Sequence, residues 1–221
     1  MRGFVFRFAP IRRKRQKFSA NISQIGLIFR RYGTVIFFTL VFGLGTLAGS
    51  LSAGRADKNF LENLDFLFTT NLEERLNQSV FSTFSASFAS NFIFVLFLFL
   101  CALAPWGWLV IPLAPAFKGF GTGLSAGYLF ITYGFKGIGF YLLVMLGGTF
   151  LFSFALIIEC IRSHSLSCKI AGSVFRGSDL SSPLTVNVKK LMLSTLYVLV
   201  ITAFSAVLDM ILWTAFSGLF F

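Results

Sequence analysis

The sequence has very little charge, and this scarcity decides its structural class. Only 12% of its 221 residues are Asp, Glu, Lys or Arg, whereas a soluble globular domain carries about 25%. So few charges cannot cover a surface that faces water, and 56% of the residues are hydrophobic. We therefore expect lipid to surround much of the chain and the fold to be all-α, a polytopic bundle of transmembrane helices.

Histidine, cysteine and catalytic motifs are also scarce. The chain has one His and three Cys, and an odd number of cysteines argues against a disulfide framework. No phosphate-binding loop, dinucleotide fingerprint, pair of catalytic carboxylates or specific metal motif is present. We therefore expect no catalytic residue, no cofactor and no metal ion, and a protein that is not an enzyme.

Two weaker patterns offer alternatives. Residues 123–127 match the G-x-S-x-G of hydrolases, with Ser125 as nucleophile and His164 as base, but that motif needs a strand-to-helix turn and here lies in an apolar helix. Cys160, His164 and Cys168 recur every four residues, so one helix face could offer ligands to zinc, although no fourth ligand is evident. The simpler interpretations are close helix packing for the first pattern, and incidental thiols or a palmitoylated cysteine for the second.

The basic residues are concentrated at the N-terminus. The net charge is +11, and nine of the 19 Lys and Arg residues lie within residues 1–31, which contain no acid. Such a cluster before a first apolar stretch is typical of a cytoplasmic or interfacial segment that attracts anionic lipid headgroups. No RNA- or DNA-binding motif accompanies the charge, so we do not expect nucleic acid as a partner.

Residues 32–221 are expected to form a single transmembrane domain. The charge-free stretches predict about five spans, at about 33–54, 91–111, 117–134, 137–161 and 191–214. Basic and acidic loops alternate between them, which places the N-terminus inside and the C-terminus outside. Residues 162–190 then form a basic cytoplasmic loop.

Residues 55–90 are expected to be an amphipathic, extracytoplasmic segment. Its acidic residues lie opposite an apolar face that is the predicted partner-binding surface and contains Phe60, Leu64, Leu67, Phe68 and Leu72. This face could equally lie flat on the membrane. The last part of the segment, rich in Ser and Phe, is either a helix at the outer interface or a lengthened entry into the second span. The expected partners are lipids, other envelope proteins or a second copy of the chain.

Glycines at four-residue spacing predict close helix packing. Gly45 and Gly49 lie in the first apolar stretch, and Gly119, Gly123 and Gly127 lie in the third. Small residues at this spacing let the backbones of two membrane helices approach each other.

Three ionisable residues lie in or beside the apolar stretches. Lys118 and Asp209 are candidate functional charges, because charges inside a membrane usually mark an ion path, a proton relay or an interhelical pair. Lys118 and Glu159 are expected near the cytoplasmic boundary, where long side chains reach water. Asp209 is expected deeper, either paired with a base on another helix or subunit or reaching the outer interface.

One stretch resembles a known family. The run Ala116-Phe117-Lys118-Gly119, followed by Gly123, Gly127 and Tyr128, resembles the signature of the stage II sporulation protein M family. The resemblance covers roughly residues 30–215. The basic N-terminus, the helical segment after the first span and the basic loop before the last span are similar as well.

This resemblance implies a non-enzymatic membrane subunit of the bacterial cytoplasmic membrane. In endospore formers, such proteins are similar to the anchor of a peptidoglycan-degrading complex that drives engulfment of the forespore. The implied partners are separate cell-wall hydrolases, bound through the extracytoplasmic segment. The alternative is a membrane subunit of a transporter or permease, with residues 112–118 and Asp209 as its site, although few polar groups are evident at the midplane.

Overall fold

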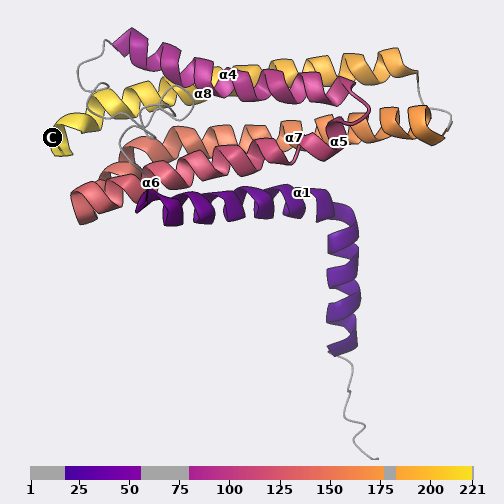
Figure 1. Cartoon of the computed structure of the whole chain (residues 1–221), viewed down its shortest axis with the longest axis horizontal. Coiled ribbons are helices and arrows are strands. Elements are labelled where there is room, and N and C mark those ends of the chain that lie inside the picture. Colours follow the sequence, from indigo (N-terminus) through magenta and orange to yellow (C-terminus); the bar gives the residue numbers. More distant parts are fainter. Residues whose placement is uncertain (1–17, 56–79, 177–182, 221) are drawn as a thin grey trace, which may run out of the picture.

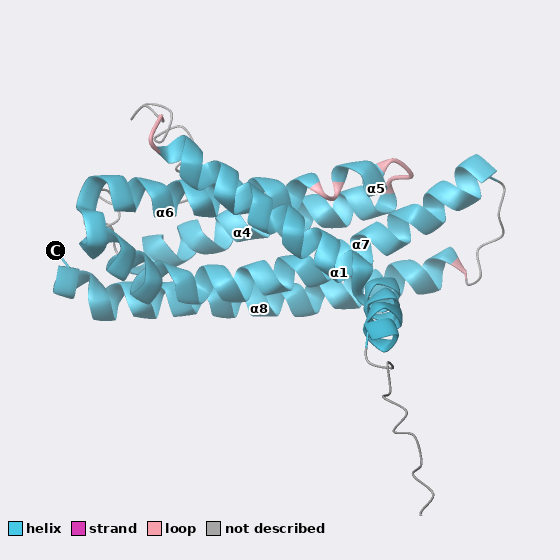
Figure 2. Ribbon diagram, turned by 90° about the horizontal axis from the view of Figure 1, so that it is seen from below, coloured by secondary structure: helices cyan, strands magenta, loops and turns pink. Residues whose placement is uncertain are grey.

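The structure, a computed structural model, describes residues 18–55, 80–176 and 183–220, and these residues contain helices and no strand (Figure 1). Its elements are α1 (Phe18–Ala53), α4 (Val80–Leu103), α5 (Gly107–Val110), α6 (Leu113–Phe140), the π-helix η1 (Tyr141–Met145), α7 (Leu146–Arg176) and α8 (Leu184–Phe220). The long helices lie side by side along one direction in both views (Figures 1 and 2). The predicted all-α class is therefore confirmed.

Four helical stretches of the described chain are long and apolar enough to cross a membrane. They are Tyr32–Ala53, Phe81–Leu103, Gly107–Phe175 and Leu184–Phe216. Their outer faces carry large apolar side chains, such as Leu51 at 79% exposure, as expected for helices that have lipid as solvent. The chain is therefore a multi-pass membrane helix bundle.

The third apolar stretch folds back on itself at a glycine. Gly134 has φ +58° and ψ −135°, which interrupts α6 between two helical parts. Only glycine adopts such a conformation without strain. Beyond it, the backbone at Gly137 lies directly against the carbonyl of Leu129, and α6 and α7 then run side by side (Figure 2).

The second apolar helix lies earlier than the expected span at 91–111. It begins at Val80 and ends at Leu103, and the chain turns at residues 104–106 before α5 and α6 return along it (Figure 1). Pro105 lies in this turn, between the end of α4 and the start of α5, where its missing N–H interrupts no helix. The Ser- and Phe-rich residues 80–90 are thus a lengthened entry into this helix, with Ser87 and Ser90 buried.

The other helix boundaries also differ from the expected ones. α1 begins at Phe18, well before residue 33, and its N-terminal part stands away from the bundle (Figure 1). α7 continues to Arg176 and α8 begins at Leu184, so most of the expected loop at 162–190 is helical. A helix does not need to stop where apolar sequence ends, because its backbone hydrogen bonds are internal. Pro183 directly precedes α8, where its missing N–H is tolerated.

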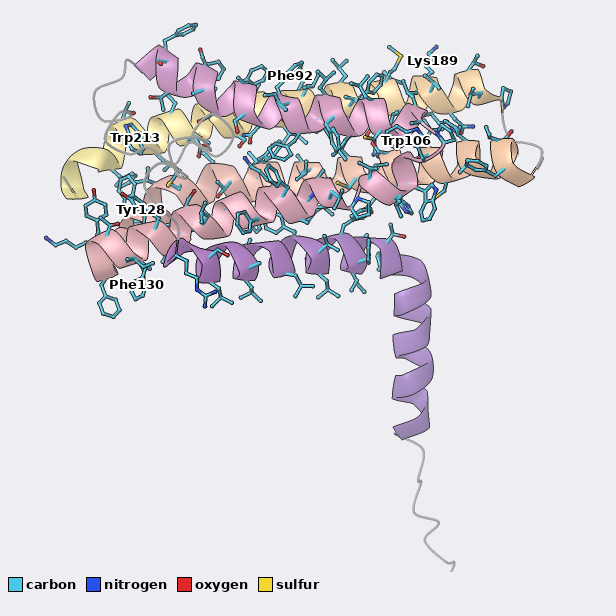
Figure 3. The ribbon with its side chains drawn as sticks, viewed as in Figure 1. Phe92, Trp106, Tyr128, Phe130, Lys189 and Trp213 are labelled. Carbon is cyan, nitrogen blue, oxygen red and sulfur yellow. The ribbon has the colours of Figure 1, made fainter. Side chains whose placement is uncertain are left out.

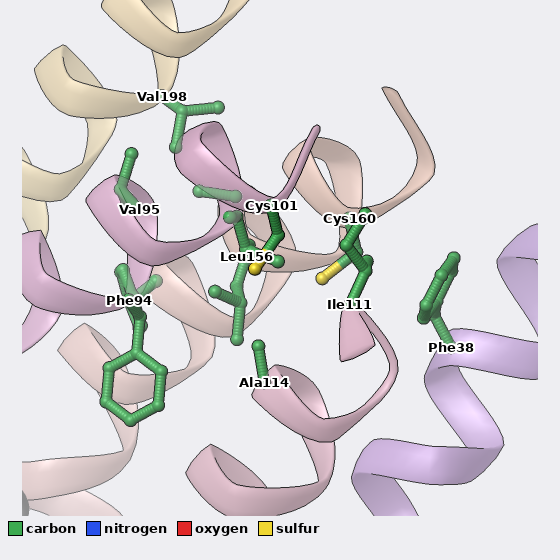
Figure 4. Packing of buried hydrophobic residues seen from close by; sticks show 12 residues of the cluster. Phe38, Phe94, Val95, Cys101, Ile111, Ala114, Leu156, Cys160 and Val198 are labelled. Atoms are coloured by element: carbon green, nitrogen blue, oxygen red, sulfur yellow. The ribbon is translucent and has the colours of Figure 1, made fainter. Parts of the chain in front are cut away.

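The apolar core lies between α4, α6, α7 and α8. Val95 and Leu98 from α4, Leu156 from α7 and Val198 from α8 are buried together (Figure 4). α1 lies at the side of this core and contacts chiefly α6. The predicted partner surface, which comprises Phe60, Leu64, Leu67, Phe68 and Leu72, lies outside the described residues.

Candidate functional site

The side chain of Lys118 is buried inside the bundle. It is only 7% exposed, and its Nζ donates a hydrogen bond to Oδ1 of Asn91 on α4 at 2.9 Å. The ammonium also lies 5.3 Å from the ring centroid of Phe94 and 5.1 Å from that of Phe152, within the range of cation–π attraction. The side chain therefore does not reach outward to water, as was expected of a long side chain, because α6 directs this lysine at α4 and α7.

Lys118 borders a small polar cavity enclosed by helices from all parts of the core. The cavity has a volume of about 30 Å³, which is room for one or two water molecules. Its lining residues are Ser87, Ser90, Asn91, Lys118, Thr122, Ser125, Tyr141, Val144, Met145, Thr149, Asp209 and Trp213. The two charges singled out in the sequence, Lys118 and Asp209, thus border the same cavity.

Asp209 reaches the cavity because α7 has a glycine opposite it. A Cβ on Gly148 would collide with the carboxylate of Asp209. One turn earlier on α8, Ser205 donates a hydrogen bond to the carbonyl of Gly148 at 2.8 Å. The glycine therefore admits the carboxylate between α7 and α8, so Asp209 belongs to the interior of the bundle.

The π-helix forms one wall of the cavity. Tyr141, Val144 and Met145 of η1 line it, and the hydroxyl of Tyr141 donates to the carbonyl of Thr122 on α6 at 3.5 Å. A π-helical turn contains more residues per turn than an α-helix and re-aims its side chains, and such turns are frequent at functional sites. Here the turn directs a phenol toward the same space as Lys118 and Asp209.

Ser125 lines this cavity, whereas His164 lies elsewhere. The hydroxyl of Ser125 donates to the carbonyl of Gly121 in the same helix at 3.0 Å. His164 packs edge-on against Phe38, with ring centroids 5.7 Å apart. The G-x-S-x-G pattern lies within helix α6 and not in the strand-to-helix turn that a nucleophile elbow requires.

The cysteines and the histidine of α7 do not form a metal site in the described part of the chain. Cys160 is fully buried in the apolar core, and Cys168 is exposed with its Sγ 3.8 Å from the ring nitrogens of His164. Among the residues that the structure describes, no group of three His, Cys, Asp or Glu side chains could hold a metal ion. Cys160 and Cys168 therefore lie in different environments, the first in the apolar core and the second at the surface.

A second buried polar contact joins α7 to α8. Glu159 has no exposed surface, so its side chain is also inside the bundle and does not reach outward to water. Its Oε1 accepts a hydrogen bond from Oγ1 of Thr195 at 2.6 Å, and its Oε2 accepts one from Oγ of Ser194 at 3.2 Å. The partner hydroxyls and Asn91 were missed in the sequence; the one available signal was an uncharged polar residue within an apolar helix.

The spaced glycines lie where α1 and α6 touch. A Cβ on Gly45 or Gly49 would overlap a backbone carbonyl of α6, and a Cβ on Gly119 or Gly123 would overlap a backbone carbonyl of α1. A Cβ on Gly127 would stand 2.6 Å from the Cβ of Ala53. The two backbones are in direct contact, which any larger side chain would prevent.

The chemistry available in the cavity beside Lys118 is limited by space. The cavity holds an ammonium, a carboxylate, a phenol and several hydroxyls, groups that can hold water or pass a proton. Sites for organic ligands usually have about 300–1,000 Å³, so this cavity does not admit a solute of that size. Comparison with known proteins gives no match, either to a family model, to a curated protein or to a solved structure.

Proposed function

We propose that this protein is a non-enzymatic membrane scaffold that anchors other proteins of the cell envelope. The observation that carries the proposal is a set of polar contacts that tie the helices together inside the bundle, one of which borders the cavity. These contacts are Lys118–Asn91, Glu159–Thr195, Ser205–Gly148 and the 2.8 Å bond from Ser167 to the carbonyl of Ala104. Such bonds hold membrane helices together at about 0.6–2 kcal/mol each, and a rigid bundle suits an anchor.

The resemblance of residues 116–128 to the stage II sporulation protein M family gives the proposal its specific form. The protein would lie in a bacterial cytoplasmic membrane with about five spans, its N-terminus inside and its C-terminus outside. It would gather cell-wall hydrolases into a peptidoglycan-degrading complex, with a role in engulfment during sporulation. Residues 55–90 would be the part that binds these enzymes.

We expect cell-wall hydrolases to accompany the tagged full chain when it is purified from its own membranes in a gentle detergent and analysed by mass spectrometry. Replacing residues 56–79 with a Gly- and Ser-rich linker of equal length should remove them. Changing Phe135, which is 87% exposed and directly follows the interruption of α6 at Gly134, to Ser should leave the hydrolases bound. Recovery of an ATPase or a solute-binding protein without any hydrolase would contradict the scaffold.

A second candidate function, a membrane subunit of a transporter, is favoured by one observation. Lys118 and Asp209 border the same cavity, and ionisable groups inside a membrane often carry a proton or an ion. The size of the cavity limits such a path to a proton or a small ion.

The two candidates differ in ion flux. For a scaffold, we expect liposomes that contain the full chain to dissipate a pH gradient no faster than empty liposomes, as followed with an enclosed pH-sensitive dye. The Asp209→Asn variant should behave in the same way, because its carboxylate would have only a structural role. A flux in the wild-type protein that Asp209→Asn abolishes would establish the transporter and refute the scaffold.

A further inference from the structure

A basic groove runs along the contact between α7 and α8, at the end of the bundle opposite Trp213. The groove has a volume of about 510 Å³, and Lys189 and Trp213 mark the two ends of α8 in Figure 3. The side chains that matter here are Arg162 and Lys169 from α7 and Lys190, Leu193, Ser194 and Tyr197 from α8. None of the lining residues is acidic.

The positive charge of the groove is only partly balanced. Glu159 and Asp209 are the only acids among the described residues. Glu159 lies one turn before Arg162, which acts on its carboxylate electrostatically, and Asp209 borders the cavity nearer the other end. Lys169 and Lys190 are exposed, so an anion can reach their ammonium groups from outside the bundle.

The groove is polar at one end and apolar at the other. Arg162 and Lys169 lie on the same face of α7, about 10 Å apart at a rise of about 1.5 Å per residue. Leu166 and Leu191 are buried at 5% and 3% exposure. Along α8, Lys190 is followed deeper in the apolar stretch by Leu193 and Tyr197, which are 50% and 69% exposed.

We propose that this groove binds an anionic phospholipid. Its phosphate would lie among Arg162, Lys169 and Lys190, and one acyl chain would follow Leu193 and Tyr197. The charge complementarity is that of basic pockets between membrane helices, which bind anionic headgroups. The groove continues onto the apolar, lipid-facing surface, which could hold an acyl chain. A free anion has no apolar part to place there. This inference does not depend on the proposed scaffold function.

Lipid retention by the full chain tests the proposal. In native mass spectrometry from a mild detergent at low salt, we expect phosphatidylglycerol to be retained about tenfold better than phosphatidylcholine. Each cation should contribute about a fivefold difference in affinity, so changing Arg162, Lys169 and Lys190 together to Gln should weaken phosphatidylglycerol binding about 100-fold. The helical circular dichroism spectrum should remain unchanged.

A matched pair of single variants keeps the test sharp if the triple variant does not fold. Lys190 lines the groove and its neighbour Lys189 does not, although both are exposed lysines of α8. Lys190→Gln should lower phosphatidylglycerol binding about fivefold, and Lys189→Gln should leave it unchanged. Equal losses in the two variants would overturn the proposal. Displacement of the lipid by an equal concentration of inorganic phosphate would overturn it too, because the groove would then be a site for a free anion.

Discussion

Gly123→Leu is expected to separate α1 from α6 and to prevent recovery of the folded protein and of any complex it forms. A Cβ at Gly123 already overlaps the carbonyl of Thr46 and lies 2.9 Å from its Cα. These are backbone atoms of α1, so no side-chain rotation relieves the clash. Overpacking of a well-packed interior costs about 1–3 kcal/mol for extra methylenes, and a full Leu side chain at a backbone contact should exceed this. Size-exclusion elution and thermal unfolding in detergent measure the effect.

The control is Gly43, a glycine of α1 that faces open space and not α6. A Cβ on Gly43 of α1 meets nothing within 4 Å, so Gly43→Leu should elute and unfold like the wild-type protein. Gly123→Ala should fall between the two, because it adds the Cβ alone. If Gly123→Leu is recovered as well as Gly43→Leu, the contact between α1 and α6 is not present in the protein.

Asn91→Leu is expected to produce the second large loss of stability. The substitution removes the oxygen that accepts the 2.9 Å hydrogen bond from Lys118 and leaves the ammonium in a site that is 7% exposed. Removing the partner of a buried hydrogen-bonded group costs about 1–3 kcal/mol in soluble proteins, and more where the group is charged. We expect a loss of about 3 kcal/mol, measured as the free energy of unfolding in mixed detergent micelles.

The double variant distinguishes a lost hydrogen bond from a packing defect. Lys118→Met removes the charge that donates to Asn91, so the double variant should lose less stability than the sum of the two single variants. A coupling of about 1–2 kcal/mol is the expected result. Strictly additive losses would mean that Asn91 and Lys118 do not interact in the folded protein.

The composition of the chain was sufficient to predict the all-α membrane bundle, because charge is scarce over long stretches. The glycine spacing also predicted close backbone contacts, and these glycines line the contact of α1 with α6. The glycine spacing could not, however, predict that α1 and α6 contact each other. Spacing along one helix describes only one surface, whereas pairing depends on the shapes of both.

The burial of the charged side chains inside the bundle could not be predicted in the same way. Lys118 and Glu159 lie near the ends of apolar stretches in the sequence, which favoured a place at the membrane boundary. Burial of Lys118 depends on Asn91, and burial of Glu159 depends on Ser194 and Thr195, all on other helices. Likewise the turn at residues 104–106 gave no charge signal, because residues 76–117 contain none before Lys118.

The contact of α1 with α6 has a consequence for the order in which the chain enters the membrane. α1 is synthesised first, but residues 54–112 must follow before α6 appears. Until then α1 has to remain in lipid without its main contact partner, which its charge-free stretch from Tyr32 to Ala53, with a mean hydropathy of 1.9, allows. Lys118 then enters a bilayer that already holds Asn91, and Asp209 arrives with α8, after the other described helices. The cation therefore meets a neutral amide first, and the carboxylate completes the polar centre later.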